Sequence, residues 1–378
     1  MNKALMVLAG LLFSICTINA LSNLGLVSNG FEPSATNLAM GGNPVGAVNY
    51  WHNDPLNAYD NPAFPALHKG ISYSNTKYVY MKLNADPAED LMYKSSMISA
   101  SFYGIGLLFP TNLSNSGKAS THIDYGEQQF TDGSFEAQIV NQYDQSDSYG
   151  FSINLPEVYR QLNPNAGSIA DMVDLSIGFS HQLHESNILN RRIEANSTNW
   201  GYLLKLKHSY RPDLKLEAAL GGSNFNALKD EIDFELGTAP VRIYQRSNIG
   251  VAFSVIKANP HYSIDNSIKS SFANLFSARI LTGRIREYAR PLFITGMGGE
   301  LGLFDTAFLR VGYHNDEEGK IKGMTYGIGI NAHYRDLVSI TYNYSFFPGG
   351  ITKEDKEITN YGLSVNVMQI ISHLLHDQ

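Results

Sequence analysis

The chain has 378 residues, of which 43% are hydrophobic, 11% aromatic and only 17% charged. An ordinary soluble domain carries about 25% charged residues, whereas the polar residues here are largely Ser, Thr and Asn. This aromatic and β-branched content excludes a disordered chain. The formal net charge of −7 argues against nucleic acid as a partner.

The first 20 residues have the pattern of a cleaved signal peptide. Lys3 precedes an apolar run from Ala4 to Phe13, which is too short to be a membrane-spanning helix of about 20 residues. Ala20 is a candidate cleavage site. The single cysteine, Cys16, lies within this segment, so the mature chain is expected to have none. Its stability then depends on backbone pairing and packing instead of disulfides.

From Ile71 onward, apolar residues alternate with small or polar ones, which is the pattern of a strand with two different faces. The clearest segments are 151–155, 173–179, 200–208, 214–220, 249–255, 307–313, 326–334, 338–346 and 361–367. Weaker segments are 71–83, 96–109, 118–130, 264–280 and 293–304. Together they predict an all-β fold of about fourteen strands.

Polar breaks separate many of these strands, as consecutive antiparallel pairing requires. Short breaks rich in Asn, Asp, Pro and Gly occur at 211–213, 224–226, 315–319, 334–336 and 348–350. Longer polar connections are predicted at 138–148, 187–199 and 351–360. Short turns combined with long loops are typical of an outer-membrane barrel.

The second face of the predicted strands favours a membrane barrel over a soluble sandwich. A sandwich has an outer face rich in Lys and Glu, whereas this face is mostly Gly, Ser, Thr and Asn. Residues 68–368 are therefore expected to form an antiparallel up-and-down transmembrane β-barrel, surrounded by lipid in a bacterial outer membrane. Aromatic residues near strand ends fit an interfacial girdle, although core aromatics of a soluble β-protein are the alternative: Tyr149, Tyr202, Tyr210, Tyr313, Tyr334, Phe346, Phe347 and Tyr361.

Residues 21–67 do not alternate, and Gly and Pro interrupt them repeatedly. The segment nevertheless carries many large apolar side chains, which it can bury by folding back into the barrel lumen. We therefore predict an N-terminal luminal hatch. Glycines there allow positive φ or close backbone contact, and a proline fixes a turn. The candidate gating residues are Met40, Gly41, Gly42, Asn61, Pro62 and Ala63.

The succession Met40-Gly41-Gly42, Asn53-Asp54 and Tyr59-Asp-Asn-Pro-Ala63 resembles the start of mature FadL-type outer-membrane proteins. That superfamily includes PorV- and PorQ-like proteins, and residues 309–347 also resemble the last hairpins of PorV-like members. The motif resemblance covers residues 35–67. It implies a hatch inside a barrel of fourteen strands, and a channel for hydrophobic or amphipathic small molecules.

The sequence departs from the family pattern in two places. Phe64-Pro65 follows the Asn-Pro-Ala turn, where many members have a small residue. The chain also continues through an apolar tail, 369–378, where bacterial barrels usually end on an aromatic residue. This tail is expected to be either a periplasmic appendage or an amphipathic turn against the barrel rim.

No catalytic, cofactor or metal site is predicted. The sequence lacks a serine-hydrolase elbow, a Walker loop and a His-Glu-x-x-His site. The glycines of 296–302 are interpreted as close packing in a curved wall. His181 and His184 end a strand, where residues three apart point to opposite faces. The acidic run 316–318 is interpreted as a solvated turn.

Three functions therefore stay open. In the leading one, the hatch moves around Asn61-Pro62-Ala63 and a hydrophobic or detergent-like small molecule passes through the wall. In the second, a closed PorV- or PorQ-like barrel docks or assembles secretion-system proteins. The third is a lipid-acting enzyme at the barrel rim, although no catalytic motif supports it.

Overall fold

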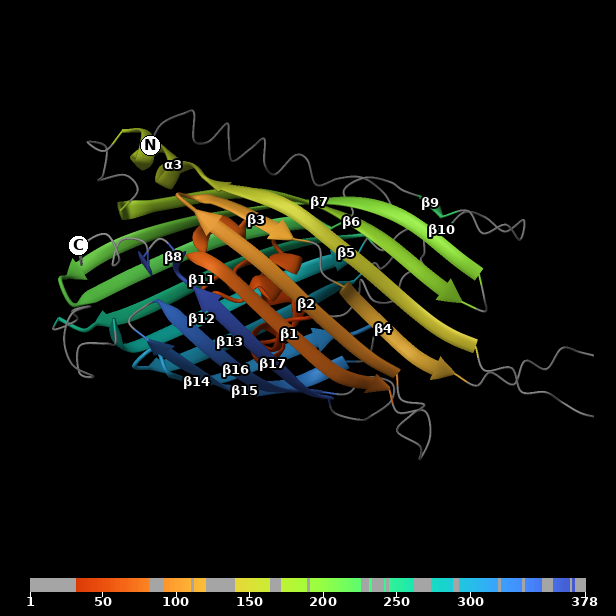
Figure 1. The fold of residues 1–378 in the computed structure, drawn as a ribbon. Coiled ribbons are helices and arrows are strands. Elements are labelled where there is room, and N and C mark those ends of the chain that lie inside the picture. The colour runs from red at the N-terminus through yellow and green to blue at the C-terminus, as the bar shows by residue number, and fades with distance from the viewer. Residues whose placement is uncertain are drawn as a thin grey trace, which may run out of the picture.

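Fifteen strands pair into one antiparallel sheet, and its closing strands β1 and β17 also pair, so the wall is a closed barrel (Figure 1). The computed structural model describes residues 32–81, 91–109, 112–119, 140–163, 171–188, 191–225, 231–232, 241–242, 245–260, 273–287, 292–318, 321–334, 337–348, 356–367 and 369–370. The expected signal peptide, hatch residues 21–31 and nearly all of the tail lie outside these ranges.

Each wall strand pairs with its neighbours along the chain, as in an up-and-down barrel. The strands are β1 (Gly70–Met81), β2 (Leu91–Phe102), β3 (Ile105–Phe109), β4 (Asn112–Ala119), β5 (Val140–Asn154), β6 (Val173–Ile188), β7 (Arg191–Arg211), β8 (Leu214–Phe225), β11 (Arg246–Ala258), β12 (Asn274–Glu287), β13 (Phe293–Leu303), β14 (Ala307–Asp316), β15 (Ile321–Tyr334), β16 (Val338–Phe347) and β17 (Lys356–Val365). A separate hairpin, β9 (Glu231–Ile232) with β10 (Val241–Arg242), lies between β8 and β11.

The barrel has fourteen strand positions, because β3 and β4 share one of them. Both pair with β2 and with β5 in succession. The expected all-β barrel of about fourteen strands is thus confirmed. No helix of the described residues is long and apolar enough to cross a membrane.

The two ends of the barrel differ. At one end, here called the termini end, β1 begins and β17 finishes, and tight turns at 103–104, 212–213 and 304–306 join neighbouring strands. The opposite end, here called the loop end, carries longer connections, including the one that contains β9 and β10. The termini end also has two longer connections, 155–172 and 259–273, and the loop end has the short connection 189–190. Tight turns at the termini end fit the periplasmic end of an outer-membrane barrel.

The barrel is apolar outside and polar inside, the reverse of a soluble β-protein. Along β11, the outward residues Val251, Phe253 and Val255 are 39%, 55% and 41% exposed. Inward positions carry buried serines and threonines such as Ser72, Ser74, Thr76, Ser95, Ser99, Ser148, Ser152, Ser176 and Thr325. Such an exterior fits a lipid environment, because lipid keeps water away from the apolar belt. The closed sheet also lets the backbone N–H and C=O groups of the wall strands hydrogen-bond to one another.

Two predicted loops are strands instead. Residues 140–154 form β5, which covers most of the polar segment 138–148, and β7 covers most of 187–199. These strands are polar because they extend toward the loop end, where neither face needs an apolar side chain. The backbone of β6 and β7 pairs as far as Ile188 and Arg191, although the side chains there are mostly polar. The prediction of loops there was wrong.

One predicted girdle residue points inward. Phe347 is 7% exposed, and its ring packs edge-on against His314 at 4.9 Å between centroids. Tyr210 and Tyr334 are 62% and 61% exposed near strand ends, as a girdle requires. Tyr361 is 55% exposed but lies in the middle of β17.

One helix lies on the wall's rim instead of inside it. α3 (Leu155–Leu162) follows β5 at the termini end, and Asn154 caps it by accepting a hydrogen bond from the Glu157 amide at 3.4 Å. It begins at Leu155, the last residue of the predicted strand 151–155, and the alternating pattern gave no sign of it.

Candidate functional site

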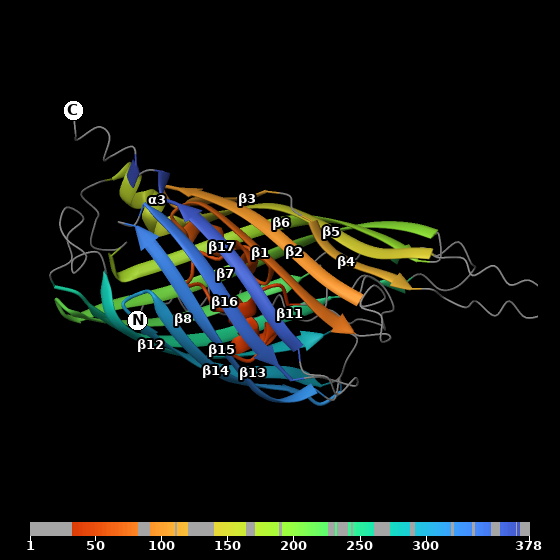
Figure 2. The same cartoon turned by 60° about the horizontal axis from the view of Figure 1, so that its bottom comes forward.

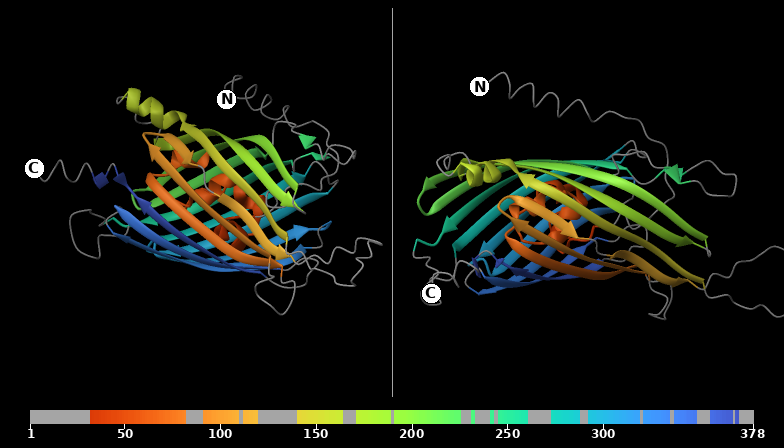
Figure 3. Two further views of the ribbon diagram at one scale, coloured as in Figure 1. Left: turned by 45° about the vertical axis from the view of Figure 1, so that its right-hand side comes forward. Right: turned by 45° about the horizontal axis from the view of Figure 1, so that its top comes forward.

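The N-terminal segment 32–67, here called the hatch, lies inside the ring of strands in every view (Figure 1, Figure 2 and Figure 3). It consists of short turns: α2 (Ala35–Ala39), η2 (Asn43–Ala47), η3 (Pro55–Tyr59) and η4 (Phe64–Leu67). Ser34 and Asp54 cap α2 and η3, and a proline stands in the first turn of each 3₁₀ helix. Frequent caps and prolines keep each turn short, because proline is tolerated in the first turn of a helix but breaks the helix at interior positions.

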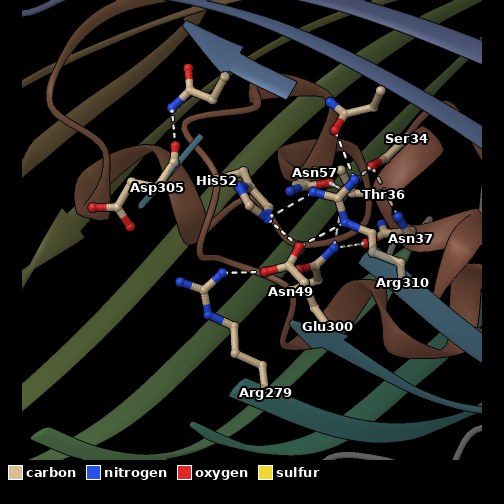
Figure 4. Close-up of polar contacts among 12 residues, drawn as sticks. Ser34, Thr36, Asn37, Asn49, His52, Asn57, Arg279, Glu300, Asp305 and Arg310 are labelled. Atoms are coloured by element: carbon tan, nitrogen blue, oxygen red, sulfur yellow. Dashed lines mark hydrogen bonds and ion pairs between the residues drawn. The ribbon is translucent and has the colours of Figure 1, made fainter. Parts of the chain in front are cut away.

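Buried polar side chains hold these turns together (Figure 4). Asn49 Nδ2 donates to Asn37 Oδ1 at 2.6 Å and to Thr36 Oγ1 at 3.1 Å. Asn37 Nδ2 in turn donates to Asp60 Oδ2 at 3.2 Å. These bonds join residues far apart along the hatch, so it is expected to move as one body.

The Met40-Gly41-Gly42 motif rests on β13 to β15. Gly41 and Gly42 have φ of 109° and 83°, which explains the need for glycine. A Cβ on Gly41 would lie 2.8 Å from the backbone nitrogen of Met297. His314 donates from Nδ1 to the Gly41 carbonyl at 2.8 Å, which fixes the motif to β14.

The Asn61-Pro62-Ala63 turn rests on β6 and β7. Asn61 Nδ2 donates to the carbonyls of Ala47 at 2.9 Å and of Tyr202 at 3.0 Å. Its Oδ1 accepts from the Ala63 amide at 3.1 Å. The Ala63 carbonyl accepts from Ser176 Oγ at 2.7 Å. Asn61 thus joins the turn, the rest of the hatch and the wall, while the two predicted motifs brace different arcs of the barrel.

A set of wall glycines lets the hatch backbone touch the wall directly. On nine wall strands, a Cβ built on an inward glycine would lie 1.9–2.9 Å from a hatch atom. At seven of these glycines the hatch atom is backbone and cannot turn away, so wall and hatch are complementary there at the level of backbone. At Gly201, Gly250 and Gly327 it is a side-chain atom of Asn61, Val48 and Ala39. This set of wall glycines, here called the glycine ring, comprises Gly106, Gly178, Gly201, Gly221, Gly250, Gly283, Gly296, Gly298, Gly312 and Gly327.

Charged side chains line the lumen on the termini side of the hatch. Glu300 is 2% exposed; it contacts Arg279, accepts from Arg310 Nε at 2.7 Å, and lies 2.7 Å from His52 Nε2 (Figure 4). Burial lowers the pKa of His52 below its usual value. Trp51 lies beneath Arg279, with the guanidinium 5.1 Å from its ring centroid. The cluster ties the hatch to β12, β13 and β14.

A second charged group lies along β6 to β8 on the same side. Lys205 and Lys207 pair with Asp174 at 2.8 and 3.2 Å. Tyr50 donates from its hydroxyl to Glu217 at 3.0 Å, and the Lys205 ammonium lies 4.9 Å from the Tyr50 ring. Burial raises the pKa of Tyr50 well above its usual value, so this hydroxyl keeps its proton.

The loop side of the hatch is mainly apolar. Apolar hatch residues pack there with inward wall residues in one buried cluster of Ala35, Leu38, Leu56, Ala58, Tyr59, Tyr78, Tyr93, Met97, Leu108, Phe225, Phe347 and Ile358. One ion pair, Arg246 with Asp60, stands within it, and the guanidinium lies 4.9 Å from the Phe225 ring. Burial, and then the nearby Asp60, raise the pKa of Glu32 well above its usual value.

Sequence reasoning found the two hatch motifs but not their partners. Glu300 and Arg310 lie on the inward face, in phase with the ring glycines Gly298 and Gly312. This shared alternation with the ring glycines is the sequence pattern that could have identified Glu300 and Arg310 as lumen residues. The described residues contain no group of three metal-binding side chains. His184 is buried at 2% with its Nε2 2.8 Å from Ser197 Oγ, while His181 lies on the opposite face against Tyr149, so the two histidines do not converge.

No protein-family model and no curated protein matches this chain. Several solved structures are similar in fold. The Ralstonia pickettii toluene transporter TbuX is 10% identical, with a TM-score of 0.40, over 89% of this chain and 99% of that one. A Pseudomonas aeruginosa FadL homologue is also 10% identical, with a TM-score of 0.45, over 89% and 99%. The Pseudomonas putida toluene transporter TodX is 10% identical, with a TM-score of 0.38, over 93% and 100%.

Replacing Asn61 with alanine is expected to loosen the hatch and raise the leak of small solutes. The change removes three hydrogen bonds and leaves the carbonyls of Ala47 and Tyr202 without this donor. The expected cost is about 2–4 kcal/mol. Single-channel conductance in planar bilayers measures this leak. The matched control is Asn53→Ala, because Asn53 is an exposed hatch asparagine; equal conductance of the two variants would contradict the role of Asn61.

Proposed function

We propose that the protein is an outer-membrane channel that admits a hydrophobic or amphipathic small molecule at the loop end and is gated by its hatch. The observation that carries the proposal is the hatch itself, which fills the lumen and meets nine wall strands through the glycine ring. A closely fitted luminal segment keeps a barrel closed at rest, which a gated channel requires.

The asymmetry of the lumen supports an apolar ligand. A molecule arriving from the loop end meets the apolar cluster that includes Tyr78, Tyr93 and Met97. On the far side of the hatch it would meet Glu300, Asp174 and their cationic partners. Apolar groups gain free energy in the first environment and lose it in the second. The direct route to the periplasm is therefore unfavourable, and an exit through the wall fits the ligand better.

The wall is irregular at the position shared by β3 and β4. Phe109 pairs with Ile98, and Leu113 pairs with Ser95, so four steps on one strand match three on the other. The pairing of this position with β5 changes by one residue in the same place. The register of β3 therefore differs by one residue from that of β4, and such a shift re-aims the side chains that follow it. This position is the place in the described wall where we propose that a ligand leaves.

Transport in proteoliposomes tests the proposal. Vesicles containing the protein are expected to take up a fluorescent long-chain fatty acid added outside, and to exclude glucose. Vesicles with heat-unfolded protein measure the background, which matters because fatty acids also cross lipid unaided. Uptake equal to that background would contradict the channel.

The second candidate is a closed barrel that docks a secretion-system component, as the PorV/PorQ resemblance implies. The tight seal of the glycine ring favours it, since a permanently closed lumen needs no gate. Affinity purification separates the two functions: a stoichiometric protein partner, together with background uptake, supports docking and contradicts transport. A bound fatty acid or detergent in the lumen supports the channel.

A further inference from the structure

A groove on the outer surface of the barrel breaks the apolar belt. It crosses β7, β8, β11, β12 and β13 and holds about 860 Å³ of empty space, part of it open to the surroundings. Its lining includes Trp200, Tyr202 and Phe293 together with Arg284 and Arg286. These five side chains leave the wall on the face opposite to the hatch; the lining also includes Asn248, whose Nδ2 donates to the hatch carbonyl of Asn43 at 3.0 Å.

The strand register fixes that orientation. The inward face of β12 carries Gly283, which meets the hatch, so the alternate residues Arg284 and Arg286 face outward. Arg284 pairs across the ladder with Ile249, and Arg286 pairs with Phe293. Both arginines are exposed. They stand about 7 Å apart along one strand, close to its loop end.

Two outward arginines here need an explanation. A cation on the lipid face of a barrel is unfavourable, increasingly so toward the bilayer midplane. Within the described chain, neither guanidinium has a carboxylate at ion-pair distance; the Arg284 guanidinium instead lies 5.0 Å from the Phe293 ring centroid. Charged side chains in such places commonly mark a binding site. An anion from the membrane would neutralise them.

The rest of the groove suits the remainder of a lipid headgroup. Asn224 donates from Nδ2 to Ser247 Oγ at 3.3 Å, and both residues line the groove. The second hydrogen of this amide nitrogen can donate to a ligand hydroxyl. Trp200 and Tyr202 stack with 6.3 Å between ring centroids and offer an apolar wall for a sugar face or acyl chain.

We propose that this groove binds a phosphorylated glycolipid of the outer leaflet, with its phosphate between Arg284 and Arg286 and a sugar hydroxyl on Asn224. Guanidinium groups suit phosphate because they donate two parallel hydrogen bonds to it. The loop-end location matches the level of headgroups in that leaflet, and the aromatic rings match the level of the interface. The site goes beyond the channel proposal and does not depend on it.

Native mass spectrometry of the detergent-solubilised protein tests the site. The probes are diphosphorylated lipid A, the same lipid without phosphates, and inorganic phosphate. The double variant Arg284→Gln, Arg286→Gln is compared with Lys77→Gln, Lys322→Gln, which removes two other exposed cations near the loop end, on β1 and β15. Gel mobility with and without heating checks that each variant is a folded barrel.

We expect the arginine variant to bind diphosphorylated lipid A roughly tenfold or more weakly, since two charge-assisted contacts are lost. The lysine variant should bind as the unchanged protein does. Equal binding of the dephosphorylated lipid would overturn the proposal. So would equal losses in both double variants, which would indicate a general charge effect, or competition by free phosphate as effective as by the lipid.

Discussion

Replacing Gly178 with valine is expected to raise the leak of small ions through the barrel. A Cβ at this position would lie 1.9 Å from the carbonyl oxygen of Pro62, which is backbone and cannot turn away. Overpacking of this kind costs about 1–3 kcal/mol. If the hatch yields and the wall does not, the ratio of displaced to seated hatch rises roughly five- to 150-fold. Conductance for small ions in planar bilayers should rise accordingly.

The control for this change is Gly299→Val. Gly299 lies on the outward face of β13, and a Cβ there would lie 3.3 Å from the nearest atom, the Arg279 carbonyl oxygen. It adds the same side chain to a wall strand without meeting the hatch. Conductance should stay at the unchanged level. A Gly178→Val barrel that is folded and still tight would show that the glycine ring does not seat the hatch.

Sequence alone predicts the wall well because a strand with two unlike faces must alternate. Residues 338–346 alternate in the sequence, and they form β16 within one residue of the predicted bounds. The choice of a membrane barrel also follows from sequence, since the second face is small and polar instead of charged. The glycines at 178, 201 and 221 contribute to that pattern, but the sequence does not indicate that they contact the hatch.

The polar parts of strands escape the same reasoning. β5 and β7 pass through segments with no apolar alternation. β5 nevertheless pairs with β6 from Asn154 to Tyr143. Backbone hydrogen bonds hold these stretches, and backbone bonds leave no trace in side-chain pattern. α3 escaped for another reason: its eight residues are too few for a helical period to emerge beside a strand.

The sequence predicts that a hatch exists, but it does not predict which wall residues the hatch contacts. Met40-Gly41-Gly42 and Asn61-Pro62-Ala63 announce tight turns from their residue types alone. Which wall strands they meet depends on partners such as Gly178 and His314, more than 100 and 270 residues away along the chain. Nor does the sequence indicate that Glu300 lies between two arginines and His52, because three strands and the hatch must first come together.

The central claim is that the hatch must move for a ligand to pass, and a reversible crosslink tests it most directly. A Cβ on Gly250 would lie 2.9 Å from Cγ2 of Val48 in the hatch. A disulfide places each Cβ about 3 Å from the partner sulfur. Val48→Cys with Gly250→Cys should therefore form a bond between hatch and β11 with little distortion. The mature chain offers no competing thiol, since Cys16 lies in the expected signal peptide.

The measurement is uptake of the fluorescent fatty acid by proteoliposomes that contain this double variant, before and after reduction, with each single cysteine variant as a control. The gated channel predicts background uptake in the oxidised protein, recovery after dithiothreitol, and no response of the single variants to reduction. Uptake by the fully crosslinked protein as fast as by the reduced protein would contradict it.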